Sequence, residues 1–155
     1  MKPGGKELLQ GLKEMGCLIA LASSTRKALV VQQLQEAGLI SFFDVIIGGD
    51  CVERSKPAPD IFLAAARELG VEPDRAYVIE DSYNGIRAAL AAGMHSIMVP
   101  DMLPANEEMR EKAEMILPSL KEVLDYFINV KLFLFQLQLD LKVFCQHCQN
   151  LLNKV

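Results

Sequence analysis

The stretch Ala76-Tyr-Val-Ile-Glu80-Asp81-Ser82 decides the fold, because an apolar run ends there in an acidic pair and a serine. A short apolar run is typical of a buried strand, and Ser82 is a good first residue for capping the next helix. Two earlier apolar runs also end in polar residues. Residues 18–22 lead into Ser23-Ser24-Thr25, and residues 44–48 lead on to Ser55-Lys56-Pro-Ala-Pro-Asp60.

The rest of the chain alternates between helical and strand patterns. Helices are expected over residues 6–15, 27–37, 60–69, 82–92 and 106–112, and strands over 17–22, 45–47, 76–79, 96–99 and 115–117. This alternation predicts an α/β fold, namely a three-layer, Rossmann-like parallel sheet with helices on both faces. Ligands of such sheets bind beyond the carboxyl ends of the strands, where all three polar segments lie. We therefore expect these segments to form one site.

Composition limits the classes of function. The chain has 155 residues, of which 51% are hydrophobic, a net charge of −4 and a pI near 5.2. This length is enough for one domain with a substantial core. The acidic balance argues against nucleic acid as a partner. No leader pattern opens the chain, and the four cysteines are not spaced like a secreted disulfide framework, so we expect a cytoplasmic protein.

The pattern changes near residue 128. Residues 136–143 alternate strictly between polar and apolar side chains, which is strand periodicity, but the same region also fits a helical heptad. Both interpretations stay open, and a helical tail would pair with a second copy of the chain. Lys131, Asp140 and Lys142 exclude a membrane span. The expected organisation is a core over residues 1–127 and an atypical apolar tail over 128–155.

The three polar segments carry atoms suited to a phosphate and a hard cation. Glu80 and Asp81 offer carboxylate oxygens to Mg²⁺, which keeps several waters and often shares a substrate phosphate. Lys56 can hold a phosphate oxygen as a point charge. Ser23 and Ser24 precede a helix. Their hydroxyls and the backbone N–H groups of the first helical turn can bind an anion. Each residue alone has a simpler explanation as a helix cap or a solvated lysine, but their order favours a magnesium and phosphate site.

Together these motifs resemble the haloacid dehalogenase superfamily of phosphohydrolases, and most of all its β-phosphoglucomutase and phosphoglycolate phosphatase-like branch, over roughly residues 2–127. The resemblance implies a Mg²⁺-dependent phosphatase or phosphomutase that acts on a small phosphorylated metabolite through an aspartyl-phosphate. Ser23 and the next amide would hold the phosphoryl group, and Lys56 would bridge it to the nucleophile. Asp81 would ligate Mg²⁺ directly, and Glu80 directly or through water. Ser82 and Asn84 belong to the same motif and would support these ligands.

One part of the family's pattern is missing. The family's first motif, Asp-x-Asp, supplies the nucleophile and the general acid–base, and no Asp-x-Asp occurs in the 155 residues. The substrate-choosing helical cap is missing too. The resemblance thus suggests the C-terminal part of a longer enzyme, which binds phosphate with negligible turnover. The alternative is a non-catalytic phosphate-binding or interaction module on the same scaffold.

The missing motif also has a structural consequence. In the family its strand lies centrally, between the strands expected at residues 18–22 and 76–79. Its loss leaves backbone N–H and C=O groups without partners or forces the neighbouring strands together. Since the tail alternates and is rich in apolar residues, we expect residues 132–144 to fill this gap or to cover the opened edge.

Overall fold

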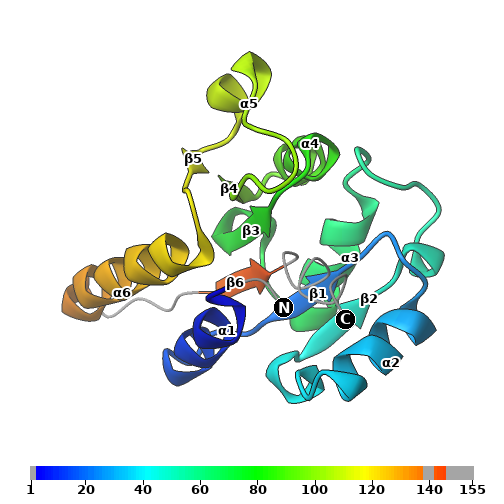
Figure 1. Cartoon of the computed structure of the whole chain (residues 1–155), viewed down its shortest axis with the longest axis horizontal. Coiled ribbons are helices and arrows are strands. Elements are labelled where there is room, and N and C mark those ends of the chain that lie inside the picture. The colour runs from blue at the N-terminus through cyan, green and yellow to red at the C-terminus, as the bar shows by residue number, and fades with distance from the viewer. Residues whose placement is uncertain (1–2, 138–141, 146–155) are drawn as a thin grey trace.

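The computed structural model describes residues 3–137 and 142–145 of an α/β fold, in which helices alternate with strands along the chain (Figure 1). The helices are α1 (Gly5–Glu14), α2 (Lys27–Glu36), α3 (Asp60–Leu69), α4 (Tyr83–Ala91), α5 (Glu107–Lys112) and α6 (Leu120–Leu137). The strands are β1 (Ala20–Ala22), β2 (Val45–Ile47), β3 (Ala76–Glu80), β4 (His95–Met98), β5 (Met115–Ile116) and β6 (Lys142–Cys145). Short 3₁₀ turns occur at Ile40–Phe42, Gly49–Cys51 and Pro73–Arg75.

The strands form two hydrogen-bonded groups, β1-β2 and β5-β4-β3-β6, and every pair in them is parallel. The groups meet where β6 lies close to β1, although these two strands are not neighbours in a described ladder. Because the strands are parallel, β1 and β3 deliver the residues that follow them to the same edge. The predicted parallel sheet is confirmed.

Helices cover both faces of the sheet, as the three-layer prediction requires. On one face, α1, α2 and α6 pack around Ile79 and Leu21. On the other, α3 and α4 pack around Ala76 and Val78. The alternation along β3 follows from strand geometry, since successive side chains point to opposite faces. The sheet is therefore buried from both sides, which explains why most residues of β1, β2 and β3 are apolar.

Two helices, α4 and α5, begin with a side-chain cap, and the cap at Ser82 was expected from the sequence. Ser82 precedes α4, and its Oγ accepts a hydrogen bond of 3.0 Å from the N–H of Gly85. Asn106 precedes α5, and its Oδ1 accepts one of 2.8 Å from the N–H of Met109. Each bond satisfies a backbone donor that has no partner within its helix.

The first strand is shorter than the predicted residues 17–22. Only Ala20–Ala22 pair with β2. Just before them, the Asp44 carboxylate accepts a 2.7 Å hydrogen bond from the N–H of Ile19, and the Asp44 N–H donates one of 2.8 Å to the Ile19 carbonyl. The N–H of Ile19 is thus bonded to the Asp44 side chain, and a longer β1 would need this N–H for pairing with a neighbouring strand. Lys13 holds this carboxylate in turn, at 2.6 Å.

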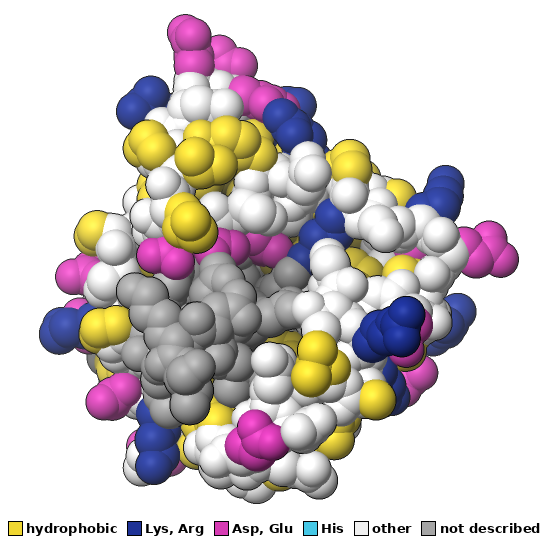
Figure 2. All heavy atoms as spheres, turned by 45° about the vertical axis from the view of Figure 1, so that its right-hand side comes forward, with side chains coloured by type: hydrophobic (Ala, Val, Ile, Leu, Met, Phe, Trp, Pro, Cys, Tyr) yellow, Lys and Arg dark blue, Asp and Glu magenta, His cyan; other side chains and the backbone are white. Residues whose placement is uncertain are grey.

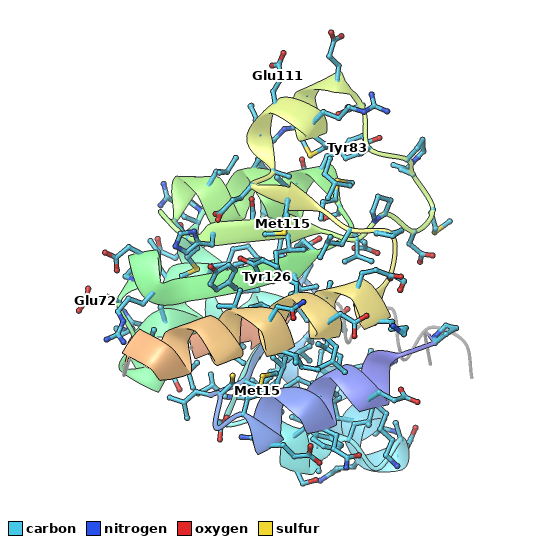
Figure 3. All side chains as sticks on the ribbon, turned by 90° about the vertical axis from the view of Figure 1, so that its left-hand side faces the viewer. Met15, Glu72, Tyr83, Glu111, Met115 and Tyr126 are labelled. Atoms are coloured by element: carbon cyan, nitrogen blue, oxygen red, sulfur yellow. The ribbon has the colours of Figure 1, made fainter. Side chains whose placement is uncertain are left out.

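The tail combines both patterns that the sequence left open. Helix α6 runs without a break through residues 127 and 128, where we expected the core to end and the tail to begin. It lies against α1 (Figure 3). The two helices are so close that a Cβ on Gly11 would lie 2.5 Å from Leu124. After the helix, β6 pairs in parallel with β3, with Cys145 opposite Ile79. The expectation that residues 132–144 supply the missing strand is confirmed only at their end, where β6 gives backbone groups of β3 their partners, and it is wrong for residues 132–137, which belong to α6. Residues 138–141 and 146–155 lie outside the described residues.

No helix in the described ranges is both long enough and apolar enough to cross a membrane.

Candidate functional site

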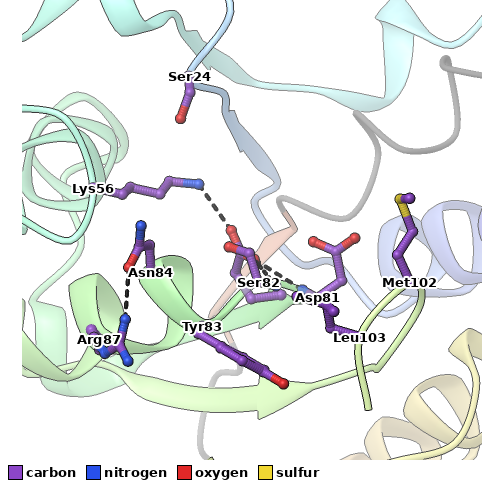
Figure 4. A pocket seen from close by; sticks show the side chains of 10 residues that line it. Ser24, Lys56, Asp81, Ser82, Tyr83, Asn84, Arg87, Met102 and Leu103 are labelled. Atoms are coloured by element: carbon purple, nitrogen blue, oxygen red, sulfur yellow. Dashed lines mark hydrogen bonds and ion pairs between the residues drawn. The ribbon is translucent and has the colours of Figure 1, made fainter. Parts of the chain in front are cut away.

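A pocket of about 560 Å³ lies beyond the carboxyl ends of β1 and β3 (Figure 4). It brings together residues from all three polar segments predicted from the sequence, and it is lined by Ser24, Lys56, Glu80, Asp81, Ser82, Tyr83, Asn84, Arg87, Met102 and Leu103. In the space-filling view of Figure 2, acidic and basic side chains meet near the middle of the face. Ser24, Lys56 and Asp81 thus line one hollow, whereas Ser23, which we expected to meet Lys56 and Asp81 there, is buried and is not among the lining residues.

A buried ion pair forms the floor of the pocket. Lys56 Nζ lies 2.9 Å from Glu80 Oε1, and the two side chains are only 6% and 2% exposed. The same Nζ lies 5.1 Å from the centre of the Phe62 ring, a favourable place for a cation. Pro57 and Pro59 follow Lys56 and lead into α3, so this lysine is anchored at the start of a helix.

The second oxygen of Glu80 is also fully engaged. Oε2 accepts hydrogen bonds from the N–H of Asp81 at 2.9 Å, from the N–H of Ser82 at 2.8 Å and from Ser82 Oγ at 2.9 Å. With Lys56 on the other oxygen, this carboxylate serves four donors of the protein itself. Glu80 therefore fixes the turn that carries Asp81, and with three donors on Oε2 a direct bond to a metal would have to form at Oε1, beside Lys56.

Burial and charge act in opposition on the pair. Burial alone would raise the pKa of Glu80, but the charge of Lys56 and the hydrogen bonds from Lys56 and Ser82 outweigh it and hold that pKa below the ordinary value. Burial lowers the pKa of Lys56, against the opposing charges of Glu80 and Asp81. Glu80 is therefore a carboxylate at neutral pH, and the ammonium of Lys56 is poorly solvated. Such a cation interacts strongly with an incoming anion.

Glycines allow the close packing around these groups. A Cβ on Gly85 would lie 2.0 Å from Glu80 Cδ, so only glycine fits against this carboxylate. A Cβ on Gly49 would lie 2.3 Å from the Ser24 carbonyl oxygen, which shows how tightly the turn after β2 packs on the loop after β1. Glycine within a helix is otherwise unfavourable. The presence of Gly85 in α4 is therefore a signal in the sequence that another group, here the Glu80 carboxylate, packs closely against this position.

The loop after β1 presents its two serines differently. Ser24 is exposed at the pocket and Figure 4 shows its hydroxyl on the side of Lys56. Ser23 is buried and is not among the lining residues; its Oγ accepts a 2.9 Å hydrogen bond from the N–H of Thr25. The N–H of Lys27, at the start of α2, already donates to Asp50 at 2.8 Å. Asp50 therefore occupies one of the helix-start donors that we expected to meet an anion.

Arg87 is a lining residue that the sequence reasoning missed. Its guanidinium binds both oxygens of Glu108, at 2.8 and 2.5 Å, and donates from Nη1 to Asn84 Oδ1 at 2.8 Å. Since the oxygen of Asn84 faces Arg87, its amide nitrogen points away from Arg87 (Figure 4). The spacing of three between Asn84 and Arg87 places them on one helical face, which is the signal that could have found this pair.

The oxygen ligands near Asp81 are suited to a Mg²⁺ ion that keeps part of its water shell. In the described part of the chain they do not form a site in which protein side chains surround the ion. Figure 4 shows the Asp81 carboxylate at the pocket. Among the residues that the structure describes, no group of three or more His, Cys, Asp or Glu side chains is arranged to hold a metal. Mg²⁺ typically binds through one or two carboxylates, several waters and substrate phosphates, which is compatible with this site.

Comparison with known proteins places this site in a family. The family model described as "Haloacid dehalogenase-like hydrolase" matches residues 1–99. A phosphorylated carbohydrates phosphatase from Thermotoga maritima is 37% identical over 130 residues, which cover 79% of this chain and 60% of that protein. The crystal structure of CbbY from Rhodobacter sphaeroides in complex with phosphate gives a TM-score of 0.71 at 39% identity, over 78% of this chain and 55% of that one.

A β-phosphoglucomutase from Clostridium difficile has the same fold, with a TM-score of 0.70 at 31% identity over 87% of this chain and 57% of that one. The chain thus spans little more than half the length of these three relatives. The family model itself covers well over half of the chain. The protein therefore belongs to the haloacid dehalogenase-like hydrolase family.

Proposed function

We propose that this chain forms the phosphate- and Mg²⁺-binding part of a phosphatase or phosphomutase that acts on a small phosphorylated metabolite. The observation that carries the proposal is the buried Lys56–Glu80 pair, at 2.9 Å, on the floor of a pocket that Ser24 and Asp81 also line. A poorly solvated ammonium beside a carboxylate suits a phosphate that is shared with a cation. The phosphate complex of CbbY and the name of the Thermotoga maritima phosphatase support the same class of ligand.

Each residue then has a distinct task. Lys56 binds a phosphoryl oxygen, and Glu80 holds Lys56 in place. Ser24 donates its hydroxyl to the phosphate, while Ser23, first expected to contact the phosphoryl group itself, shapes the loop through its bond with the N–H of Thr25. Asp81 would hold Mg²⁺ directly. When bound, the ion would neutralise charge on the phosphoryl oxygens.

The supporting residues act behind these contacts. Ser82 holds the Glu80 carboxylate and caps α4. Asn84 turns its amide nitrogen away from Arg87, so this nitrogen can donate to a ligand. In this proposal Glu80 reaches the metal through water, because Oε2 already accepts three hydrogen bonds and Oε1 is paired with the ammonium of Lys56.

The proposal gives this chain binding without turnover. An attack on phosphorus needs a nucleophile, and the Asp-x-Asp motif that supplies it in the family is absent from the 155 residues. The residues of the pocket can still position the phosphate and stabilise its charge. Without the nucleophile of the Asp-x-Asp motif, the attack on phosphorus does not begin. We therefore expect phosphate esters to bind and to be hydrolysed at a rate close to that of the buffer.

The test measures binding and turnover separately. Calorimetry with inorganic phosphate should detect binding that requires Mg²⁺, and p-nitrophenyl phosphate should show no hydrolysis above background. Lys56→Met should weaken phosphate binding at least tenfold, whereas Lys121→Met, at a surface lysine that is 73% exposed, should not change it. Because Lys56→Met leaves Glu80 without its cation, Lys56→Met/Glu80→Gln serves as a second variant. Unchanged phosphate affinity in both variants, or no binding to the unmodified chain, would refute the proposal.

A further inference from the structure

The pocket has an apolar rim that the phosphate site does not explain. Met102 and Leu103 belong to the loop between β4 and α5, and they are 92% and 56% exposed. Both line the pocket, and Figure 4 shows them on the opposite side from Lys56. Two adjacent large apolar side chains exposed at a pocket are more typical of a ligand contact than of an ordinary surface.

Neighbouring elements hold this rim in place. Tyr83 Oη, from the first turn of α4, donates a 2.6 Å hydrogen bond to the carbonyl of Pro104, next to Leu103. On the far side of the loop, α5 packs on α4 through the buried side chain of Met109. Both contacts anchor the loop on the C-terminal side of Met102 and Leu103.

The apolar side chains gather at one end of the pocket. Lys56, Ser24 and Asn84 lie on one side, and Met102 and Leu103 lie on the other, with the Asp81 carboxylate beside them (Figure 4). A volume of about 560 Å³ leaves room for an organic group beside the phosphate. A sugar placed against the rim would lose water from its hydroxyls without gaining donors or acceptors from Met102 and Leu103 side chains, which is unfavourable.

We propose that the phosphate ester bound here carries an aromatic or similarly flat apolar group, and that Met102 and Leu103 contact this group. The inference rests on the proposed function, because the phosphate must bind at Lys56 to bring the group to the rim. The thioether of Met102 is polarisable and makes favourable contacts with ring edges. Tyr83 lies between the two sides of the pocket and offers its own ring.

The experiment compares esters of equal charge in the presence of Mg²⁺. Calorimetry should show that 1-naphthyl phosphate binds roughly tenfold tighter than glucose 6-phosphate, since the rim removes apolar surface from water in the first case only. Met102→Ser/Leu103→Ser should abolish this preference and leave the affinity for inorganic phosphate within about twofold. The matched control is Leu63→Ser/Leu90→Ser, at positions that are 39% and 40% exposed and do not line the pocket. The control should keep the preference.

The outcomes separate this inference from the proposed function. If inorganic phosphate fails to bind the unmodified chain, the proposed function is wrong and the inference falls with it. If inorganic phosphate binds but the naphthyl and glucose esters bind equally well, only the inference is overturned. A preference that survives Met102→Ser/Leu103→Ser would also overturn it, because the apolar contact would then lie elsewhere.

Discussion

Gly85→Ala tests the arrangement at the floor of the pocket. Gly85 lies in the first turn of α4, and a Cβ there would sit 2.0 Å from Glu80 Cδ and 2.2 Å from Glu80 Oε1. Carboxylates at the end of a long side chain usually move aside at little cost. This one is 2% exposed and holds Lys56 and Ser82, so it can move only by breaking those contacts.

The size of the effect follows from the contacts that are lost. Hydrogen bonds to a charged group contribute about 1.5–3 kcal/mol each, and at least two of the four on Glu80 would break. The gain in helix propensity from glycine to alanine offsets at most about 1 kcal/mol. The net loss is on the order of 3 kcal/mol, which corresponds to a fall in Tm of roughly 6–12 °C for a chain of this size.

Thermal and urea unfolding, followed by circular dichroism, would measure this loss. Gly11→Ala is the matched control, because Gly11 is also a helical glycine, but its Cβ would meet Leu124 Cδ1, at 2.5 Å. That methyl group can rotate away, so the control should change the unfolding free energy by no more than about 1 kcal/mol. The reasoning is refuted if Gly85→Ala proves as stable as Gly11→Ala.

Further perturbations should separate the roles of the remaining groups. Lys56→Met should lower the unfolding free energy by about 3–5 kcal/mol, because it leaves a buried carboxylate without its cation, and adding Glu80→Gln should restore part of the loss in a urea titration. Since the pKa of Glu80 lies below the ordinary 4.5, its contribution is complete above pH 4.5 and is lost as the pH falls further; urea midpoints should therefore drop more steeply in acid for the unmodified chain than for Glu80→Gln. Asp81→Asn should weaken Mg²⁺-dependent phosphate binding at least tenfold by calorimetry with little change in Tm, and an equal affinity would contradict its assignment as the ligand. Ending the chain after Leu137 removes β6, so amide exchange of β3 should accelerate at least tenfold relative to β5; equal rates would show that β6 does not protect β3.

The regular part of the fold could be predicted because its signals are local. Apolar spacing and the bracketing prolines and glycine gave α3, and the apolar run gave β2, with the bounds that the structure has. The start of β1 could not be read in this way. Asp44, 25 residues after Ile19, takes the Ile19 N–H with its side chain, and no local pattern reports such a contact.

The tail was ambiguous for a different reason. Residues 136–143 alternate like a strand, but the region also fits a heptad, because both patterns place an apolar side chain at Leu137 and Leu141. Tertiary packing selects the structure of each described part. Helix α6 packs against α1, and residues 142–145 pair with β3 as β6. The start of α6 did have a local signal, since Ser119 and Glu122 have the spacing of a capping box and are hydrogen-bonded to each other.

Strand periodicity, applied to the acidic pair, could have predicted different roles for Glu80 and Asp81. The sequence predicts both Glu80 and Asp81 as metal ligands, Asp81 directly and Glu80 directly or through water. Strand periodicity makes Glu80 share a face with Val78, and that face packs against α3, the helix that follows Lys56. Parity alone therefore directs Glu80 toward the lysine, while Asp81 begins the turn beyond the strand. On this reasoning a substitution at Glu80 acts mainly on stability and one at Asp81 mainly on metal-dependent binding, although both residues carry the same functional group.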